Sequence, residues 1–297
     1  MPEHREREVF SDWEQVGKVW LPPQLVPEPL PLAVGLFEGA GGFACGFHQA
    51  GWHVVAGSEW WPVAVQTYLC NLGSPSTMVY VGKTASPDAT KKERRVFEQA
   101  GGEFITAVEF FDLLPLPNSH TDAGFGPGTG WIAGKDIESH PCEVFFCCDV
   151  HELTGEFVLD TLGLDEGDVG CVMGGPPCQG FSVAGQQDVD DDRNQLVFEF
   201  ARVVCEIQPQ SFVMENVPGI LNMVTPQGVP VIDALALAFQ AGGMGEHEAL
   251  KRSLLSTAGL GAAVKGAKKY GRHKADVVDD GDDADVLDEQ LEIGALA

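Results

Sequence analysis

The sequence predicts an α/β protein in which a parallel sheet carries helices on both faces. Short apolar runs alternate along the chain with stretches of helical spacing, which is the pattern of strand–helix–strand units. Glycines or acidic residues follow directly after several of these runs, where strands would end. The 297 residues suffice for one large domain. No stretch approaches the roughly 20 apolar residues of a membrane helix.

Three regions are expected along the chain. Residues 1–30 are polar and then proline-rich, which favours an extended lead-in over a helix. Residues 31–250 carry the alternating pattern and form the predicted domain. The tail, residues 251–297, is basic and then acidic, and its composition predicts disorder.

The first part of the domain alternates strand and helix twice. The apolar run 32–37 predicts a strand, because it stops at a glycine-rich turn. Residues 43–50 then predict a helix that Gly51 closes. Residues 52–57 predict the second strand, and residues 61–69 predict the second helix.

The next segment, residues 73–142, has a different composition. It is rich in Gly, Pro, Ser and Thr, and one amphipathic stretch, residues 89–99, lies inside it. We expect an insertion with partial order in the predicted domain. Its few basic residues make DNA contacts from this segment the less favoured interpretation.

The alternation resumes after the insertion. Residues 143–150, 169–173 and 211–214 predict strands, and residues 194–207 and 231–239 predict helices. No strand pattern follows the last helix, so we expect the sheet to be incomplete at its C-terminal side.

The net charge of −26 argues against a protein that binds DNA unaided. Residues 251–274 hold seven Lys or Arg and no acid, whereas residues 275–297 hold nine acids and no base. The tail therefore accounts for little of the imbalance, and the body itself is acidic. A DNA-binding protein usually presents a basic face, because phosphates repel an acidic one.

The eight cysteines suggest neither a disulfide framework nor a metal site. Cys142, Cys147 and Cys148 lie close together, but their spacing is wrong for zinc. The charged residues 1–8 precede no apolar run, so they do not resemble a secretory signal. A reducing, cytoplasmic location is the simplest expectation.

Residues suited to a nucleoside ligand follow the predicted strands, where ligands of such sheets bind. Glycines in the first turn let a ligand approach the backbone. A carboxylate after the second strand can accept from both ribose hydroxyls, and a tryptophan beside it can stack on a purine. An acid after the third strand can accept from an exocyclic amine, although such an acid is more often a helix cap. These residues are Gly39, Gly41, Gly42, Glu59, Trp60 and Asp149.

The sharpest local feature is Gly174-Gly175-Pro176-Pro177-Cys178-Gln179-Gly180-Phe181-Ser182. The two prolines restrict the backbone before the cysteine, and glycines flank it. A cysteine in such a loop is exposed and held, which favours a nucleophile over a buried structural thiol. Glu215 follows the next strand, where apolar surroundings would make its carboxyl a proton donor.

In this order the motifs resemble the DNA cytosine-5 methyltransferases, over roughly residues 31–243 without the insertion. Two of them, the cysteine loop and Glu-Asn-Val about 37 residues later, are highly specific together. The motifs are Leu36 to Gly42, Glu59-Trp60, Asp149, Pro177-Cys178-Gln179, Arg193-x-x-Leu196 and Glu215-Asn216-Val217. The resemblance implies a Rossmann-like, S-adenosylmethionine-dependent methyltransferase sheet.

The resemblance also implies a mechanism. The Cys178 thiolate would add to C6 of a cytosine flipped out of DNA, while Glu215 protonates or hydrogen-bonds N3. C5 would then take the methyl group of S-adenosylmethionine. Asn216 would orient the loop and the base.

The same resemblance assigns the cofactor residues. Those of the first turn would line the methionine part, Glu59 would hold the ribose, and Trp60 and Asp149 would hold the adenine. The full implied set is Phe37, Gly39, Gly41, Gly42, Glu59, Trp60, Asp149, Pro176 and Leu196.

The chain also departs from the family pattern. We find no Gln-x-Arg-x-Arg motif, no room for a target-recognition domain, and no final cofactor-closing motif. Gly35 stands where the family often has an acid, and Glu38 lies inside the first loop, which is tolerable if only its backbone faces the cofactor.

Three interpretations stay open. The chain is a compact, phage-like or restriction–modification methyltransferase, active alone or with a second polypeptide that supplies target recognition. Alternatively, it is a truncated non-catalytic relative that binds cofactor or protein. In the third interpretation, the cysteine loop serves a different nucleotide-modifying transfer, on a free nucleotide or with another cofactor. The intact Cys178 and Glu215 favour the first, and the acidic charge favours the others.

Overall fold

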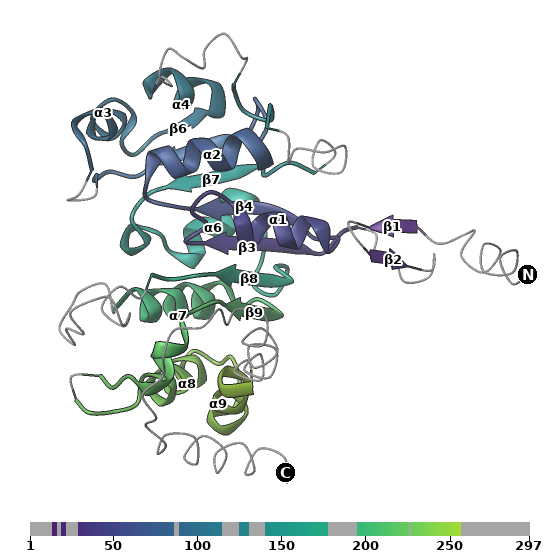
Figure 1. The fold of residues 1–297 in the computed structure, drawn as a ribbon, viewed down its shortest axis with the longest axis vertical. Coiled ribbons are helices and arrows are strands. Elements are labelled where there is room, and N and C mark those ends of the chain that lie inside the picture. The colour runs from purple at the N-terminus through teal and green to yellow at the C-terminus, as the bar shows by residue number, and fades with distance from the viewer. Residues whose placement is uncertain are drawn as a thin grey trace, which may run out of the picture. The chain divides into compact units, whose positions relative to one another are not determined.

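Figure 1 shows the fold in a computed structural model of the chain. The structure describes residues 14–16, 19–21, 29–85, 89–114, 125–130, 140–177, 195–225 and 227–256. The first two ranges, β1 (Glu14–Val16) and β2 (Val19–Leu21), pair with each other in an antiparallel ladder. Their ladder falls within the range expected as an extended lead-in.

A seven-stranded sheet has the strand order β6-β5-β7-β4-β3-β8-β9 (Figure 1). Neighbouring strands are parallel except β5 and β6, which run antiparallel. The strands are β3 (Leu32–Leu36), β4 (His53–Ser58), β5 (Met78–Val81), β6 (Phe104–Thr106), β7 (Val144–Cys147), β8 (Cys171–Gly174) and β9 (Ser211–Met214).

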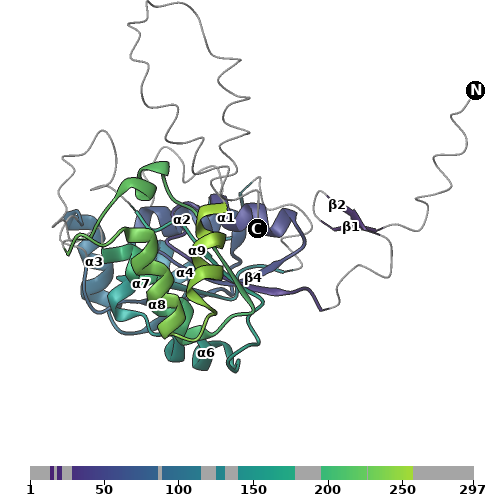
Figure 2. The same cartoon turned by 90° about the horizontal axis from the view of Figure 1, so that it is seen from below.

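Helices cover both faces of this sheet, and one apolar cluster lies between the sheet and the helices on each face (Figures 1 and 2). One cluster contains side chains of α6 (Gly155–Leu162), α7 (Leu196–Ile207) and α8 (Val231–Ala241). The other contains side chains of α1 (Gly42–Gln49), α2 (Pro62–Leu72), α3 (Lys91–Ala100) and α4 (Ala107–Leu113). The predicted fold class, an α/β sheet with helices on both faces, is confirmed.

The central strands are apolar throughout because helices cover them on both sides. All four residues of β7 and of β8 are buried, which is typical of interior parallel strands. Successive side chains of β3 enter opposite clusters, with Ala33 on one face and Val34 on the other. Because the strands are packed on both faces, their ends, where the following loops begin, are held in fixed positions.

Most predicted elements are present with bounds shifted by a few residues. The strand predicted at 211–214 is β9 itself, and the helix predicted at 194–207 is α7, Leu196–Ile207. The helix predicted at 61–69 extends to Leu72. Among the described residues, α8 is followed by helix α9 (His247–Ser256) and by no strand.

The segment 73–142 contributes more to the sheet than its composition indicated. β5 pairs with both β6 and β7, so it lies inside the sheet, and α3 and α4 bury apolar side chains against one face. The amphipathic stretch 89–99 of this segment is part of α3, whereas β5, β6 and α4 were not predicted. β5 and β6 are too short to show a clear period between neighbouring Gly, Ser and Pro residues.

Helices α6 and α9 were not predicted. α6 begins after Thr154, whose hydroxyl accepts from the Phe157 N–H at 3.1 Å, and it ends at Gly163 in a left-handed conformation. These two residues are ordinary start and stop signals. α9 contributes Leu250 to the core from a stretch with weak periodicity.

None of the helices in the described ranges has the length and apolar character needed to cross a membrane.

Candidate active site

Five loops that carry predicted site residues meet at one edge of the sheet. They follow β7, β4, β3, β8 and β9, which are successive neighbours and parallel, so their carboxyl ends lie at the same edge. Ligands of such sheets bind outside this edge. The candidates placed there are Phe37, Gly39, Gly41, Gly42, Glu59, Trp60, Asp149, Pro176, Glu215 and Asn216.

The turn after β3 has a backbone that few residues adopt without strain. Phe37, Gly39 and Gly41 have positive φ angles of 55°, 54° and 90°. A Cβ on Gly41 would lie 2.6 Å from Leu72 Cδ1, so this side of the turn packs tightly against α2. A Cβ on Gly42 would meet no atom within 4 Å. The turn is therefore packed at Gly41 and open at Gly42, where a ligand can approach the backbone.

Glu59 links the turn after β3 to the start of α2. Its Oε2 accepts from the Gly39 N–H at 3.0 Å, and its Oε1 accepts from the Trp61 N–H at 3.0 Å. Burial raises the pKa of the Glu59 carboxyl, and the N–H groups of Trp61 and Gly39 oppose that rise. A carboxylate offers about four acceptor positions, so two remain for ligand hydroxyls.

Two tryptophans follow Glu59, and the sequence indicated only the first. Trp60 is half-buried, whereas Trp61 is 48% exposed. The Trp61 Nε1 donates to Glu93 Oε1 at 2.6 Å and ties this loop to α3. Pro62, in the first turn of α2, was the signal that Trp61 stands at a helix start.

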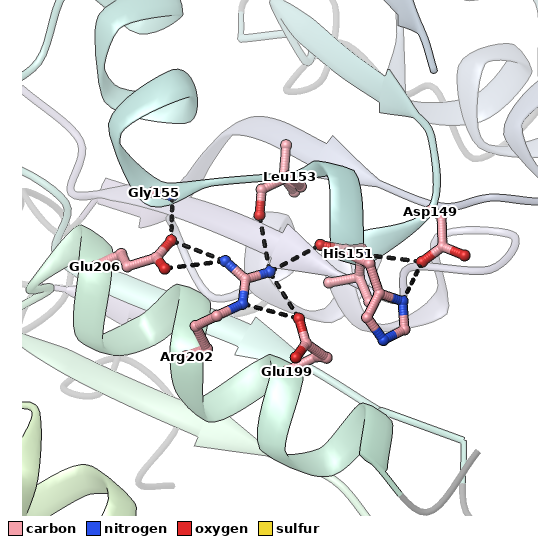
Figure 3. Close-up of polar contacts among 8 residues, drawn as sticks. Asp149, His151, Leu153, Gly155, Glu199, Arg202 and Glu206 are labelled. Atoms are coloured by element: carbon pink, nitrogen blue, oxygen red, sulfur yellow. Dashed lines mark hydrogen bonds and ion pairs between the residues drawn. The ribbon is translucent and has the colours of Figure 1, made fainter. Parts of the chain in front are cut away.

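Asp149 follows β7 and caps the 3-10 helix η3 (Val150–Glu152). Its Oδ1 accepts from the His151 N–H at 3.0 Å and lies 2.6 Å from His151 Nδ1 (Figure 3). The capping role that the sequence left open is therefore present. Both contacts involve Oδ1, so Oδ2 offers an acceptor for a ligand amine.

Arg202 of α7 holds the loop that carries Asp149 in place, and the sequence did not indicate it (Figure 3). Its Nη2 donates to the carbonyls of Val150 and Leu153 at 2.9 and 3.0 Å. Its other nitrogens donate to Glu199 and Glu206 one turn away on either side. This guanidinium therefore joins the loop after β7 to the helix that follows the cysteine loop.

The loops after β8 and β9 are hydrogen-bonded to each other. The Asn216 Nδ2 donates to the Pro176 carbonyl at 3.3 Å, and the Glu215 N–H donates to the Gly174 carbonyl at 2.9 Å. Glu215 is exposed, so the apolar surroundings expected around it are not present among the described residues. Its Oε2 lies 3.2 Å from the Cβ position of Gly175. The carboxylate thus lies beside the residues that lead into the cysteine loop.

Cys178 lies outside the described residues, as does Arg193. The loop can be followed to Pro177, two residues beyond Gly175, and again from Gln195. Leu196 then begins α7, where it is half-buried against the core of that face.

The cysteines of the described residues are poor nucleophiles where burial raises the thiol pKa, because the thiolate is the reactive form. Burial raises the pKa of Cys142 to about 12. It acts in the same direction on Cys70, Cys147, Cys148, Cys171 and Cys205.

Comparison with known proteins identifies the family of the chain. The family model for C-5 cytosine-specific DNA methylase matches residues 33–95 and 145–232, about half of the chain. The chain belongs to the C-5 cytosine-specific DNA methylase family. The matched ranges include the loops after β3, β4, β7, β8 and β9.

Individual relatives agree with this assignment. The Type II methyltransferase M.XorII of Xanthomonas oryzae is 36% identical over 124 residues, covering 42% of this chain and 25% of its own length. M.AgeI of Thalassovita gelatinovora is 43% identical over 86 residues, covering 29% and 20%. M.AquIA of Picosynechococcus is 45% identical over 75 residues, covering 25% and 30%. The matches span less than a third of the length of each of these relatives.

The family match covers only part of the segment 73–142. β5 lies within the matched range 33–95, whereas β6 and α4 fall between the two matched ranges.

The described part of the chain contains no group of three or more metal-ligating side chains.

Proposed function

We propose that the chain transfers a methyl group from S-adenosylmethionine to C5 of cytosine in DNA, through a covalent bond between Cys178 and C6. The observation that carries this proposal is the bond between Asn216 and the Pro176 carbonyl. It joins the loop of the acid to the loop of the nucleophile at the ligand-binding edge of the sheet.

The cofactor part of the proposal rests on the turns after β3, β4 and β7. The open space at Gly42 and the spare acceptor positions of Glu59 and Asp149 fit the methionine, ribose and adenine parts in turn. Trp60 supplies an aromatic face beside Glu59, and Phe37 stands at the head of the turn. Gly39 and Gly41 shape its backbone, and Pro176 and Leu196 complete the expected set. Bound there, the cofactor supplies an electrophilic methyl group.

The chemistry of the base rests on the other two loops. Cys178, as a thiolate, adds to C6 and moves electron density to C5, which makes C5 nucleophilic. Glu215 donates a hydrogen bond or proton at N3 and so stabilises the charge that develops on the ring. After methylation, loss of the C5 proton and departure of the thiolate restore the aromatic ring. Asn216 keeps the loop of Cys178 beside Glu215.

The substrate is a cytosine that leaves the DNA duplex, because C6 and N3 are inaccessible within the stack. The net charge of −26 supplies no general attraction to phosphates. We therefore propose that a second polypeptide supplies target recognition. β9, the last strand of the sheet in the described part of the chain, and the loop after it expose apolar side chains suited to such a partner, namely Val213, Val217, Leu221 and Val224.

Transfer of labelled methyl groups to mixed-sequence DNA tests the function. The wild-type chain is expected to label DNA, and Cys178→Ser is expected to lower the rate at least 10³-fold, about 4 kcal/mol. Half-buried Cys45 is not part of the proposed site, so Cys45→Ser is the matched control and should retain the wild-type rate.

Undiminished labelling by Cys178→Ser would contradict the proposed nucleophile. Binding of S-adenosylmethionine without transfer by wild type, with or without added candidate partners, would instead support the cofactor-binding module left open by the sequence.

A further inference from the structure

Glu38 carries a buried carboxyl group that the proposed reaction does not use. Its side chain is 6% exposed, and neither carboxyl oxygen has a hydrogen-bond partner among the described residues. Burying an unpartnered polar group costs roughly 1–3 kcal/mol or more. Glu38 stands in the turn after β3, between Phe37 and Gly39, where a small residue would avoid this cost.

The carboxyl group folds back over the strands instead of pointing into the site. A Cβ on Gly35 would overlap Glu38 Oε1 and would lie 2.5 Å from Cδ and 2.8 Å from Cγ. A Cβ on Gly57 would lie 2.7 Å from Phe145 Cε2 and 3.4 Å from Glu38 Cγ. Gly35 and Gly57 are register partners on β3 and β4. The space beside Gly35 is thus a hollow in the sheet that the Glu38 side chain fills, whereas the Phe145 ring fills most of the space beside Gly57.

The main chain of Glu38 frames the turn at the same time. Its N–H donates to the Ser58 carbonyl at 3.0 Å, and its carbonyl accepts from the Gly41 N–H at 2.9 Å. The positive φ of Phe37, 55°, directs the chain into this arrangement at a cost of about 1 kcal/mol or more. Glu38 therefore links the two features, because its main chain bonds within the turn while its side chain packs against the strands.

We propose that Glu38 is the positioning residue of the glycine turn, because its carboxyl group fills the space of a side chain at position 35 and holds residues 39–42 in a cofactor-binding shape. This inference rests on the proposed binding of S-adenosylmethionine. It also explains the departure from the family pattern at both positions. The carboxyl group of Glu38, three residues later, occupies the space that an acidic side chain at position 35 would enter.

The charge state of Glu38 makes this device sensitive to pH. Burial raises the pKa of the Glu38 carboxyl to about 8, and the nearby Glu59 adds to the rise. The N–H of Ala44 in α1, which is close to the carboxyl but outside hydrogen-bonding geometry, opposes the rise. The titratable groups that face it are Glu59 after β4, Tyr68 of α2 and Cys142 before β7, and none of these is a cation. Glu38 is therefore neutral at pH 7 and becomes an unpaired buried anion above pH 8.

The pH dependence has a definite sign. The folded chain holds a proton on Glu38 that the unfolded chain releases near pH 4.5, so stability falls as pH rises from 4.5 to about 8. If only the neutral form keeps the turn in shape, affinity for S-adenosylmethionine falls about tenfold between pH 7 and pH 9.

The test combines substitutions at positions 35 and 38 with two measurements, thermal unfolding of the free protein and calorimetric titration with S-adenosylmethionine. Gly35→Ala is expected to lower Tm in the wild-type chain, since its methyl group displaces the carboxyl. The same substitution in a Glu38→Ala chain is expected to leave Tm unchanged or raise it, since the hollow is then empty. Gly35→Asp with Glu38→Ala is expected to bind the cofactor more tightly than Glu38→Ala alone.

Glu38→Gln separates the charge from the shape. It is expected to bind within twofold of wild type at pH 7 and to keep that affinity at pH 9, where wild type loses tenfold. Glu38→Ala is expected to bind at least tenfold more weakly at both pH values. The matched control is Glu98→Gln, which changes an exposed carboxylate on α3 and should show the wild-type pH profile.

Equal, additive losses of Tm for Gly35→Ala in both backgrounds would overturn the inference, as would a Glu38→Gln profile identical to that of wild type. A wild-type chain that bound no S-adenosylmethionine would contradict the proposed function. The unfolding measurements would still decide whether Glu38 fills the hollow.

Discussion

At the scale of single residues, the candidate site depends on a few side chains that bond to main-chain groups of neighbouring loops. Glu59 accepts from Gly39 and Trp61, and Asn216 donates to Pro176. These bonds set the shape of the loops before any ligand arrives. Removing one of them should therefore affect the step that its loop serves and leave the other steps intact.

Asn216→Ala provides such a test at the loop of the proposed nucleophile. The substitution removes the bond to the Pro176 carbonyl and the bond from the Val217 N–H to Asn216 Oδ1. We expect the single-turnover methyl-transfer rate to fall at least tenfold while the affinity for S-adenosylmethionine changes less than twofold. Stability should fall by about 1 kcal/mol, the net value of a typical hydrogen bond.

Asn222→Ala is the control for this substitution, because Asn222 is an exposed asparagine in the following 3-10 helix (Pro218–Asn222). An equal loss of rate in Asn222→Ala, or a parallel loss of cofactor affinity in Asn216→Ala, would show that the bond does not act on the loop of Cys178.

The sequence predicted these residues better than it predicted their surroundings. The glycine turn, Glu59, Asp149 and Asn216 lie at the carboxyl edge as expected, because each follows a strand with a clear apolar run. The inward fold of Glu38 could not be predicted, since it depends on Gly57 being the register partner of Gly35. Strand pairing of this kind is not written in any local pattern.

At the scale of elements, α7 connects two parts of the site. Its N-terminus follows the segment of Cys178, and its middle carries Arg202, which bonds to the loop of Asp149 (Figure 3). Glu206 extends the link, because its Oε2 also accepts from the Gly155 N–H at 2.7 Å. A substitution at Arg202 should therefore weaken binding at the proposed cofactor site, through the loop of Asp149.

Arg202→Lys should lower the free energy of unfolding by about 2 kcal/mol, because a single ammonium group cannot serve two carbonyls and two carboxylates at once. We also expect weaker binding of S-adenosylmethionine, by a factor of about three to ten, since the loop of Asp149 loses its anchor. Chemical denaturation and calorimetric titration measure the two effects.

Arg95→Lys, on the exposed side of α3, is the control and should change neither quantity. Unaltered cofactor affinity in a clearly destabilised Arg202→Lys protein would mean that the loop of Asp149 keeps its shape without the guanidinium.

The elements that the sequence missed share a physical cause. β5 and β6 are short, and their pairing with β7 and with each other supplies the stability that local propensity does not. α6 had its signals in Thr154 and Gly163, but its apolar side chains were not read as a helical face. Tertiary packing, which local patterns do not contain, decided both cases.

At the scale of the whole molecule, the fold and the family agree, while the net charge bears on how the chain would bind DNA. The match to C-5 cytosine-specific DNA methylases covers every strand of the seven-stranded sheet except β6. The charge of −26 is unfavourable for DNA binding by this chain alone. These facts motivate the proposal that DNA recognition involves a second polypeptide at the β9 edge.

Trapping of a covalent complex on DNA that contains 5-fluorocytosine is the most direct measurement of the central claim. With fluorine in place of the C5 proton, no proton can be removed from C5 after methyl transfer. The thiolate therefore cannot be eliminated, and the protein stays attached to C6. The account predicts a denaturation-resistant protein–DNA complex that requires S-adenosylmethionine, is absent in Cys178→Ser, and maps to Cys178 by mass spectrometry. A complex that forms equally in Cys178→Ser, or that maps to another cysteine, would contradict it.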